Sequence, residues 1–498
     1  MSFGSQSPAR TVMLVSALAL GLAQPALATR VRRRGRTEVT PLMLKLDAIV
    51  SRAIRDGATP GAALAIGHAD DEPEIRTYGR IDWGRNAAPV TETTLYDLAS
   101  VTKVVATTPA AMLLVQTGQL DLDHTVASYL PWWPREGAKG RITVRQLLLH
   151  TSGLPAGNEL WRVEGDREAR IRHMADEPLI AQPGAVTEYS DLGMILLGAV
   201  LESITRERLD TFVQGHLFRP LAMADTRYLP LRAEDGPPVP LARIAPTEEA
   251  GRRGHLQGDV DDGNAWALGG VAGHAGLFSS IRDLARFSRL ILGATEGEST
   301  DVLDAGVIRS FAADRPDGRR ALGWDGAGSS SWGRYFSPVS FGHNGYTGTS
   351  IWIDPERDLY VVLLTNRVDP SASNEKHLAL RRDVSEAVSD ASPIRMAVAD
   401  ASPGEANVFA AEVAAARTIF THPLESLRRA TARRHSAHAA RKAHVRRGAG
   451  AARSTRAGRA AHTARSARAR ERHGGAPTHA AASSHQTHKR RRTHQHRR

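Results

Sequence analysis

Ser100 and Lys103 are the residues of this 498-residue chain whose types and spacing most directly suggest chemistry. The apolar stretch that follows, residues 104–115, predicts a helix that begins near Ser100. Side chains three positions apart share one face of a helix, so a hydroxyl and an amine would meet there. A serine becomes a nucleophile when a neighbouring base takes its proton, and a helix start favours the developing negative charge. The pair predicts an acylating serine hydrolase, although the same spacing is also typical of an ordinary helix cap followed by a solvated Lys.

Two later motifs make the pattern more specific. Tyr189 and Asp191 lie where a polar loop gives way to an apolar helix, and His343 and Gly345 lie at the edge of a predicted strand. A Ser-x-x-Lys, a Tyr-x-Asp and a basic-x-Gly triplet in this order resemble the motifs of the serine β-lactamase and penicillin-binding-protein superfamily. The chain resembles in particular its class C-like branch, which includes low-molecular-weight D,D-carboxypeptidases and family VIII-type esterases.

The resemblance covers about residues 41–390 and extends beyond the three motifs. Further similar segments lie at residues 97–99, 148–154, 268–277 and 342–348. It implies an α+β fold of the β-lactamase/transpeptidase type, in which an antiparallel sheet built from both ends of the domain is flanked by an inserted, mostly helical region.

The hydrophobic periodicity predicts elements that suit this fold. Helices are expected at both ends and in the middle, and strands near both ends. The expected helices are residues 41–54, 193–205, 281–292 and 375–388, in addition to the helix after Ser100; the expected strands are residues 62–66, 75–81, 339–342, 349–353 and 359–365.

Each motif residue has an expected role in catalysis. Ser100 attacks a carbonyl and becomes the acyl-enzyme, while Lys103 and Tyr189 share the transfer of its proton. Which of these two is the base stays open. Asp191 stands where the superfamily more often has Asn. An ionised Asp would pair with Lys103 and hold it charged, which favours Tyr189 as the base.

The third motif is expected to face the substrate. His343 replaces the Lys of related proteins, so its charge should change near pH 6.5, the usual imidazole pKa, beside a substrate carboxylate. Gly345 and Tyr346 complete this side, and the backbone N–H groups of Ser100 and Tyr346 should form the oxyanion hole. His150 and His274 are expected to be structural hydrogen-bonding residues.

Several other chemistries lose support. The chain contains no cysteine, which excludes disulfides, thiolate chemistry and Cys-based zinc sites. It also lacks a G-x-S-x-G elbow, an H-E-x-x-H zinc motif and a glycine-rich phosphate loop. No cofactor and no metal are expected.

Composition divides the chain into five parts. A basic start, an apolar run and an Ala-x-Ala site predict a signal peptide, and hence export to the periplasm or beyond with no transmembrane helix in the mature protein. The predicted parts are the signal peptide at residues 1–28, a basic linker at 29–40, the hydrolase domain at 41–390, an Ala-rich linker at 391–427 and a disordered Ala/Arg/His tail at 428–498.

The net charge of +12 belongs to the C-terminal end of the chain. Residues 421–498 contain 21 Lys and Arg against two acidic residues, a net charge of +19 that leaves the rest at −7. Such a segment suits contact with an anionic envelope or with nucleic acid.

The sequence therefore predicts a secreted serine hydrolase that acts on a small molecule or peptide with a scissile amide or ester, most simply a D-Ala-D-Ala carboxypeptidase or an esterase. A class C-like β-lactamase is one alternative. An alternative of another class is a non-catalytic protein that binds the envelope or polyanions through its cationic tail. The acyl donor and the oligomeric state stay open.

Overall fold

The computed structural model describes residues 40–394, apart from residues 230–238, 249–252, 299, 317, 319 and 328–334. The predicted signal peptide and tail lie outside the described residues, as do all but the ends of the two predicted linkers.

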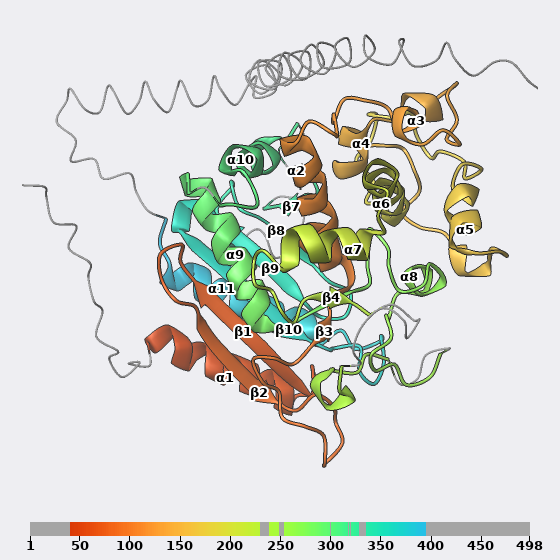
Figure 1. The fold of residues 1–498 in the computed structure, drawn as a ribbon. Coiled ribbons are helices and arrows are strands. Elements are labelled where there is room, and N and C mark those ends of the chain that lie inside the picture. Colours follow the sequence, from red (N-terminus) through yellow and green to blue (C-terminus); the bar gives the residue numbers. More distant parts are fainter. Residues whose placement is uncertain are drawn as a thin grey trace, which may run out of the picture. The chain divides into compact units, whose positions relative to one another are not determined.

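A seven-stranded sheet forms the centre of the fold (Figure 1). Every pair of neighbouring strands in it is antiparallel. The strand order is β2 (Glu74–Gly79), β1 (Gly61–Gly67), β10 (Leu359–Thr365), β9 (Ser350–Asp354), β8 (Phe341–Asn344), β7 (Trp324–Gly326) and β6 (Arg320–Ala321).

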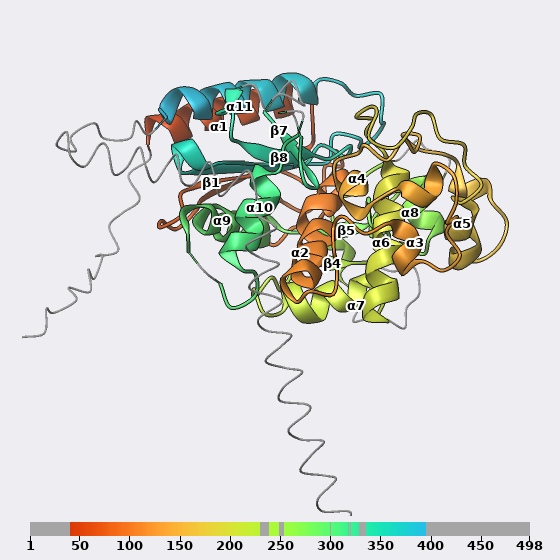
Figure 2. The same cartoon turned by 90° about the horizontal axis from the view of Figure 1, so that it is seen from above.

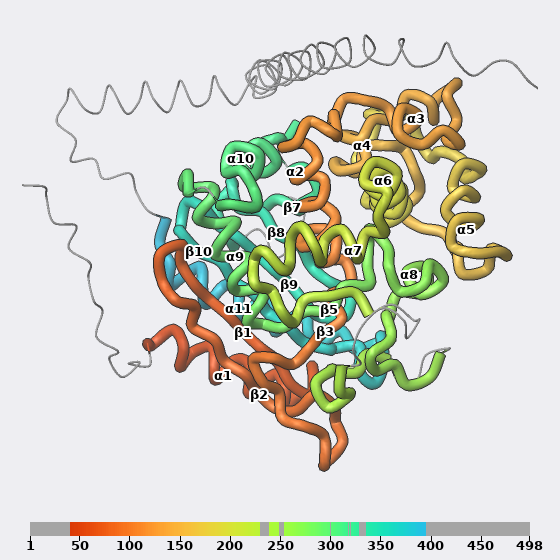
Figure 3. Tube along the Cα trace, viewed as in Figure 1, coloured from red at the N-terminus to blue at the C-terminus, as the bar shows by residue number. Residues whose placement is uncertain are grey.

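Strands from opposite ends of the described chain pair inside this sheet. Leu64 of β1 lies opposite Leu363 of β10, and Figure 3 shows the red and cyan segments side by side. The predicted α+β fold, with an antiparallel sheet built from both ends of the domain, is confirmed. Because both strands are buried on both faces, their sequences are nearly continuous apolar runs.

The alternation of side chains along β1 and β10 divides the core into two layers. Leu64 and Val361 point into the layer under the terminal helices, whereas Ala65 and Val362 belong to the larger core on the other face. Helices α1 (Pro41–Arg55) and α11 (His377–Ala391) cover the first face, and α9 (Ile281–Glu296) packs on the second (Figure 2).

The start of α1 follows from its sequence. The Thr40 side chain accepts a hydrogen bond from the backbone N–H of Met43, and Pro41 occupies the first helical position. Met43, Leu46 and Val50 then place one apolar stripe against the sheet.

A mostly helical region is inserted between the two sets of strands (Figure 1). A small sheet of three short strands, β3 (Tyr96–Asp97), β5 (Leu277–Ser279) and β4 (Arg227–Tyr228), accompanies it. Among the described residues its α-helices are α2 (Thr108–Gln116), α3 (Val126–Tyr129), α4 (Val144–Leu148), α5 (Arg167–His173), α6 (Asp191–Thr205), α7 (Leu209–Val213) and α8 (Gly263–Ala267), and α10 (Ala305–Ala313) follows α9.

The helix predicted after Ser100 is less regular than its apolar sequence suggests. A 3₁₀ turn, Ala99–Val101, precedes a π-helical turn, Lys103–Thr107, and α2 begins only at Thr108. The stretch Ala99–Gln116 is long and apolar enough by composition to cross a membrane, but most of it is buried in this domain.

Other elements differ from the prediction at their ends. The strand predicted at 339–342 begins at Phe341 and runs to Asn344, so His343 lies within the strand and not at its edge. Strands β6 and β7 and the small sheet were not predicted, because two- or three-residue strands carry too little alternation to identify.

Gly273 is a position where helix α6 and a loop make close contact. An added Cβ would lie 2.1 Å from the carbonyl oxygen of Met194, and the Gly273 carbonyl accepts a 2.7 Å hydrogen bond from Thr107. We expect Gly273→Ala to lower the free energy of unfolding by about 2 kcal/mol or more, since backbone atoms have to move. Urea unfolding measures this. Gly215→Ala is the matched control, because no atom lies within 4 Å of its added Cβ; equal stabilities of the two variants would contradict the argument.

Candidate active site

Ser100 Oγ accepts hydrogen bonds from two side chains, those of Lys103 and Tyr189. Lys103 Nζ lies 2.9 Å from Ser100 Oγ, and the Tyr189 hydroxyl lies 2.8 Å from the same oxygen. The three side chains come from the 3₁₀ turn, the π-helical turn and the residue just before the N-cap of α6. The structure thus brings the first two sequence motifs together around one hydroxyl, within the range in which protons transfer.

The Lys103 ammonium is buried and has two further partners. Its Nζ lies 2.7 Å from Asp191 Oδ1 and 3.1 Å from the carbonyl oxygen of His274. Burial lowers the pKa of Lys103, but the attraction of Asp191 and Tyr189 outweighs it and raises the pKa to about 12. Lys103 is therefore charged at neutral pH, as expected for an ionised aspartate at this position.

Tyr189 is surrounded by rings and cations. The His150 ring lies 4.8 Å from the Tyr189 ring, and Lys103 Nζ and the Arg320 guanidinium lie 4.9 and 5.2 Å from its centre. Burial raises the pKa of the Tyr189 phenol, and the Lys103 charge opposes this rise. The two cations would stabilise a phenolate if the proton left.

His150 has the structural role expected from the sequence. Its Nδ1 accepts a 3.0 Å hydrogen bond from the backbone N–H of Ser190, the N-cap of α6, which fixes the neighbouring Tyr189. Burial and repulsion from Arg320 and Lys103 lower the pKa of His150, so the ring is neutral beside the phenol.

The residue before Ser100 has a left-handed backbone conformation. Ala99 has φ 46°, a conformation that a residue with a Cβ rarely adopts. Asp97 supports it: Oδ1 accepts from the N–H of Ala99 at 2.8 Å, and Oδ2 accepts from the N–H of Asp261 at 2.7 Å. Ser100 is thus displayed by a bent backbone that a buried carboxyl group holds in place.

The turn after β8 forms hydrogen bonds with this same backbone. Thr347 Oγ1 donates to the carbonyl oxygen of Asp97 at 2.7 Å, and Thr349 Oγ1 donates to that of Leu98 at 3.0 Å. At Gly345 an added Cβ would lie 2.5 Å from the Leu98 carbonyl oxygen, which explains the glycine. Tyr346, with a side chain 55% exposed, lies in the same turn. The turn with Gly345 and Tyr346 therefore lies beside the backbone segment that leads into Ser100.

The structure corrects the expected charge of His343. The ring is buried, and burial lowers its pKa to about 4, although the carboxylate of Asp325 opposes this. His343 is therefore neutral at physiological pH, and its charge does not change near pH 6.5. Its Nδ1 lies 2.8 Å from the Asn344 carbonyl oxygen, which makes Nδ1 the donor and Nε2 a hydrogen-bond acceptor.

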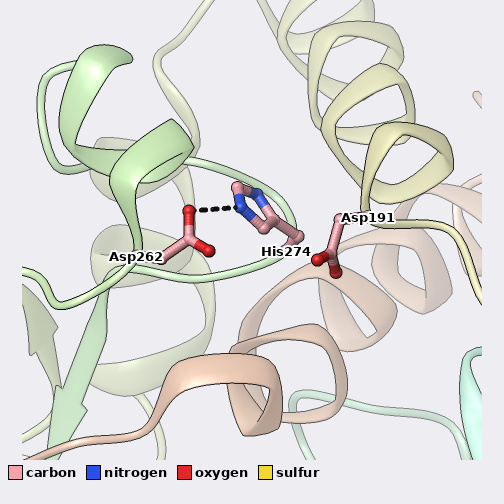
Figure 4. A group of neighbouring side chains, drawn as sticks. All are labelled: Asp191, Asp262 and His274. Atoms are coloured by element: carbon pink, nitrogen blue, oxygen red, sulfur yellow. Dashed lines mark hydrogen bonds and ion pairs between the residues drawn. The ribbon is translucent and has the colours of Figure 1, made fainter. Parts of the chain in front are cut away.

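Asp191, Asp262 and His274 form a compact group (Figure 4). Asp191 joins this group to Lys103. His274 Nε2 lies 2.8 Å from Asp262 Oδ1, and attraction to His274 holds the pKa of Asp262 well below its usual range despite burial. Each carboxylate thus has a side-chain partner within the protein: Asp191 contacts Lys103, and Asp262 contacts His274. In the described residues this group forms a polar network beside Lys103.

Sequence analysis missed several residues of the site. In the sequence Asp262 looks like an ordinary N-cap residue, and it does cap α8. His274, which contacts Asp262, was expected only to form structural hydrogen bonds. Arg320 and Asp325 pair at 2.6 Å behind Tyr189 and His343. Their strands are too short to predict, so no pattern placed them at the site.

Comparison with known proteins agrees with this geometry. The Beta-lactamase family profile matches residues 46–386. The chain belongs to this family. Its members act as serine hydrolases, and the chain is a serine hydrolase of the β-lactamase and penicillin-binding-protein superfamily, as the motifs predicted.

Named relatives lie within the same superfamily. The chain is 33% identical over 364 residues to the N-acetylmuramyl-L-alanine amidase of Bacillus subtilis strain 168, covering 66% of this chain and 81% of the relative. It is 34% identical over 316 residues to a putative D-alanyl-D-alanine carboxypeptidase of Salmonella typhi, covering 57% and 72%. The crystal structure of SurE aligns with a TM-score of 0.56 and 27% identity over 72% of this chain and 80% of SurE.

The ion pair of Asp191 with Lys103 should determine how kcat/KM of this serine hydrolase depends on pH. With Lys103 charged and the pKa of Tyr189 raised, kcat/KM should still rise above pH 9, because the phenolate is the minor form. Tyr189→Phe should lower kcat/KM by about 10²-fold or more and remove this rise. In Asp191→Asn the carboxylate that opposes the effect of burial on Lys103 is gone, so the pKa of Lys103 should fall. The rise of kcat/KM with pH should then begin at a lower pH.

Steady-state kinetics from pH 5 to 10 measure these profiles. Asp176→Asn is the control, since that carboxylate is 82% exposed. An Asp191→Asn profile that superimposes on the wild-type curve would show that Asp191 does not set the protonation of Lys103.

Proposed function

We propose that this protein is an exported D-Ala-D-Ala carboxypeptidase that works through an acyl-enzyme on Ser100. The observation that carries the proposal is the pair of contacts to Ser100 Oγ, from Lys103 Nζ at 2.9 Å and the Tyr189 hydroxyl at 2.8 Å. The similarity to the putative D-alanyl-D-alanine carboxypeptidase of Salmonella typhi and the sequence motifs support the same substrate class.

In the proposed acylation, Ser100 Oγ attacks the carbonyl carbon of the penultimate D-Ala. Tyr189 acts in its phenolate form, which the Lys103 ammonium stabilises, and the Ser100 proton passes to this phenolate oxygen and leaves a neutral phenol. The N–H groups of Ser100 and Tyr346 hold the oxyanion. As the tetrahedral intermediate collapses, the C–N bond breaks and the amine of the leaving D-Ala takes the proton from Tyr189. Water then attacks the ester by the same route in reverse.

A carboxylesterase is the second candidate, and the neutral His343 favours it. Where related proteins carry a Lys, a permanent charge faces the substrate; here burial keeps the imidazole uncharged. A neutral ester needs no cation at this position, whereas the carboxylate of a peptide substrate would gain only hydrogen bonds.

The nucleophile and the substrate are tested together. A fluorescent penicillin should label the wild-type protein on the peptide that contains Ser100, and Ser100→Ala should lose both the label and all hydrolysis. Rates are then compared for a D-Ala-D-Ala peptide, p-nitrophenyl acetate and nitrocefin. Release of D-Ala as the fastest reaction supports the carboxypeptidase, and a preference for the ester supports the second candidate. Labelling that persists in Ser100→Ala would contradict the acyl-enzyme.

We further propose that the chain is exported and that its basic tail binds anionic polymer or lipid at the envelope. The support is compositional: the predicted signal segment and the net charge of +19 at residues 421–498. Binding of this kind depends on counterion release and falls steeply with salt.

Truncation after Ala401 should leave ester hydrolysis and the melting temperature nearly unchanged, because the sheet and α11 end before that residue. It should abolish co-sedimentation with vesicles of phosphatidylglycerol at low salt, whereas the full chain should bind at low salt and be released at high salt. Loss of hydrolysis or of folding on truncation would place the tail within the catalytic domain.

A further inference from the structure

Two arginine side chains lie behind the turn that carries Tyr346. Arg381 of α11 donates through Nη2 to the carbonyl oxygens of Gly345, at 2.6 Å, and Thr349, at 2.7 Å. Arg367, just after β10, donates through Nε to the Tyr346 carbonyl oxygen at 2.8 Å, and its guanidinium lies 4.5 Å from the centre of the Tyr346 ring. Cations therefore hold the carbonyl groups on both sides of Tyr346.

Burying the charged side chain of Arg381 in this position costs free energy of folding. Its side chain is buried, and among the described residues no carboxylate lies within ion-pair distance of it. Burial, together with repulsion from Arg367, lowers the pKa of Arg381 to about 9, which leaves it charged near neutral pH. A buried charge without a counter-ion is destabilising. Neutral donors could hold a turn at lower cost, so the charge itself requires an explanation.

The position of the charge supplies one. The Gly345 carbonyl that Arg381 binds belongs to the same peptide group as the N–H of Tyr346. A cation hydrogen-bonded to a peptide oxygen polarises the group and makes its N–H a stronger donor. Arg367 fixes the next peptide and so restricts the rotation of this one.

We propose that Arg381 is a positioning residue for catalysis: through the Gly345–Tyr346 peptide group it orients and polarises the Tyr346 N–H that stabilises the oxyanion. This inference rests on the proposed function, because an oxyanion arises only if Ser100 attacks a carbonyl. Arg381 itself touches neither the substrate nor the reacting atoms.

A purely mechanical role for Arg381 would give different results. If the side chain only held the turn, removing it would lower stability and activity together. If its charge polarises the peptide, Arg381→Met should remove a desolvation cost and leave the melting temperature unchanged or higher, while kcat falls. Stability and activity should then move in opposite directions.

The experiment compares Arg381→Met, Arg381→Lys and Arg381→Gln with the wild type, using p-nitrophenyl acetate. Removing a whole oxyanion donor costs about 10²–10³-fold in kcat, so weakening one should cost about tenfold, with KM nearly unchanged. Lys keeps the charge and should retain most of kcat; Gln keeps a donor without the charge and should resemble Met. Arg382→Met is the matched control, since Arg382 is exposed and pairs with Asp383 at 2.8 Å.

Infrared spectroscopy gives a readout that a structural role would not move. In the acyl-enzyme formed from 13C-carbonyl p-nitrophenyl acetate, the ester carbonyl band should shift to higher frequency in Arg381→Met and Arg381→Gln, because a weaker oxyanion hole polarises the carbonyl less. An unchanged band, or a Gln variant as active as the Lys variant, would overturn the proposal. If Arg381→Met does not fold, the Lys and Gln pair decides the question. A wild-type protein that forms no acyl-enzyme contradicts the proposed function instead.

Discussion

The buried ammonium of Lys103 is the constraint on which the site depends. A charge inside a protein persists only with partners, and those of Lys103 come from three segments: Ser100 three residues before it, Asp191 at the start of α6, and the His274 carbonyl before β5. Each partner is fixed by its own local structure. The need to neutralise one cation thus determines how the inserted helical region is joined to the segment that carries Ser100.

A second set of contacts joins the sheet to the same point. Two threonine hydroxyls of the turn after β8 bind the backbone just before Ser100, and glycine at position 345 lets the two backbones approach. The serine therefore lies where the helical region and the sheet meet. Side chains from the helical region form hydrogen bonds with its hydroxyl. The turn after β8 binds the backbone that precedes it.

Much of this arrangement could be predicted from sequence, for definite physical reasons. Long apolar strands such as β1 and β10 and amphipathic helices such as α1 and α9 have strong periodicity, and the motif residues have distinctive spacing. The sequence does not show which polar side chains are buried. The low pKa of His343 depends on neighbours distant in the chain, and Arg381 looks like any other arginine of a surface helix until its position is known.

The pairing of β1 with β10 also affects how this protein folds. The two strands lie about three hundred residues apart, yet they are neighbours in the sheet. A ribosome must therefore synthesise almost the entire domain before the central pair can close, and β1 stays unpaired on that edge until then. Contacts of such sequence separation make folding slow, because loop closure precedes any gain from pairing. A chain of this topology can therefore meet a chaperone while it is still unfolded.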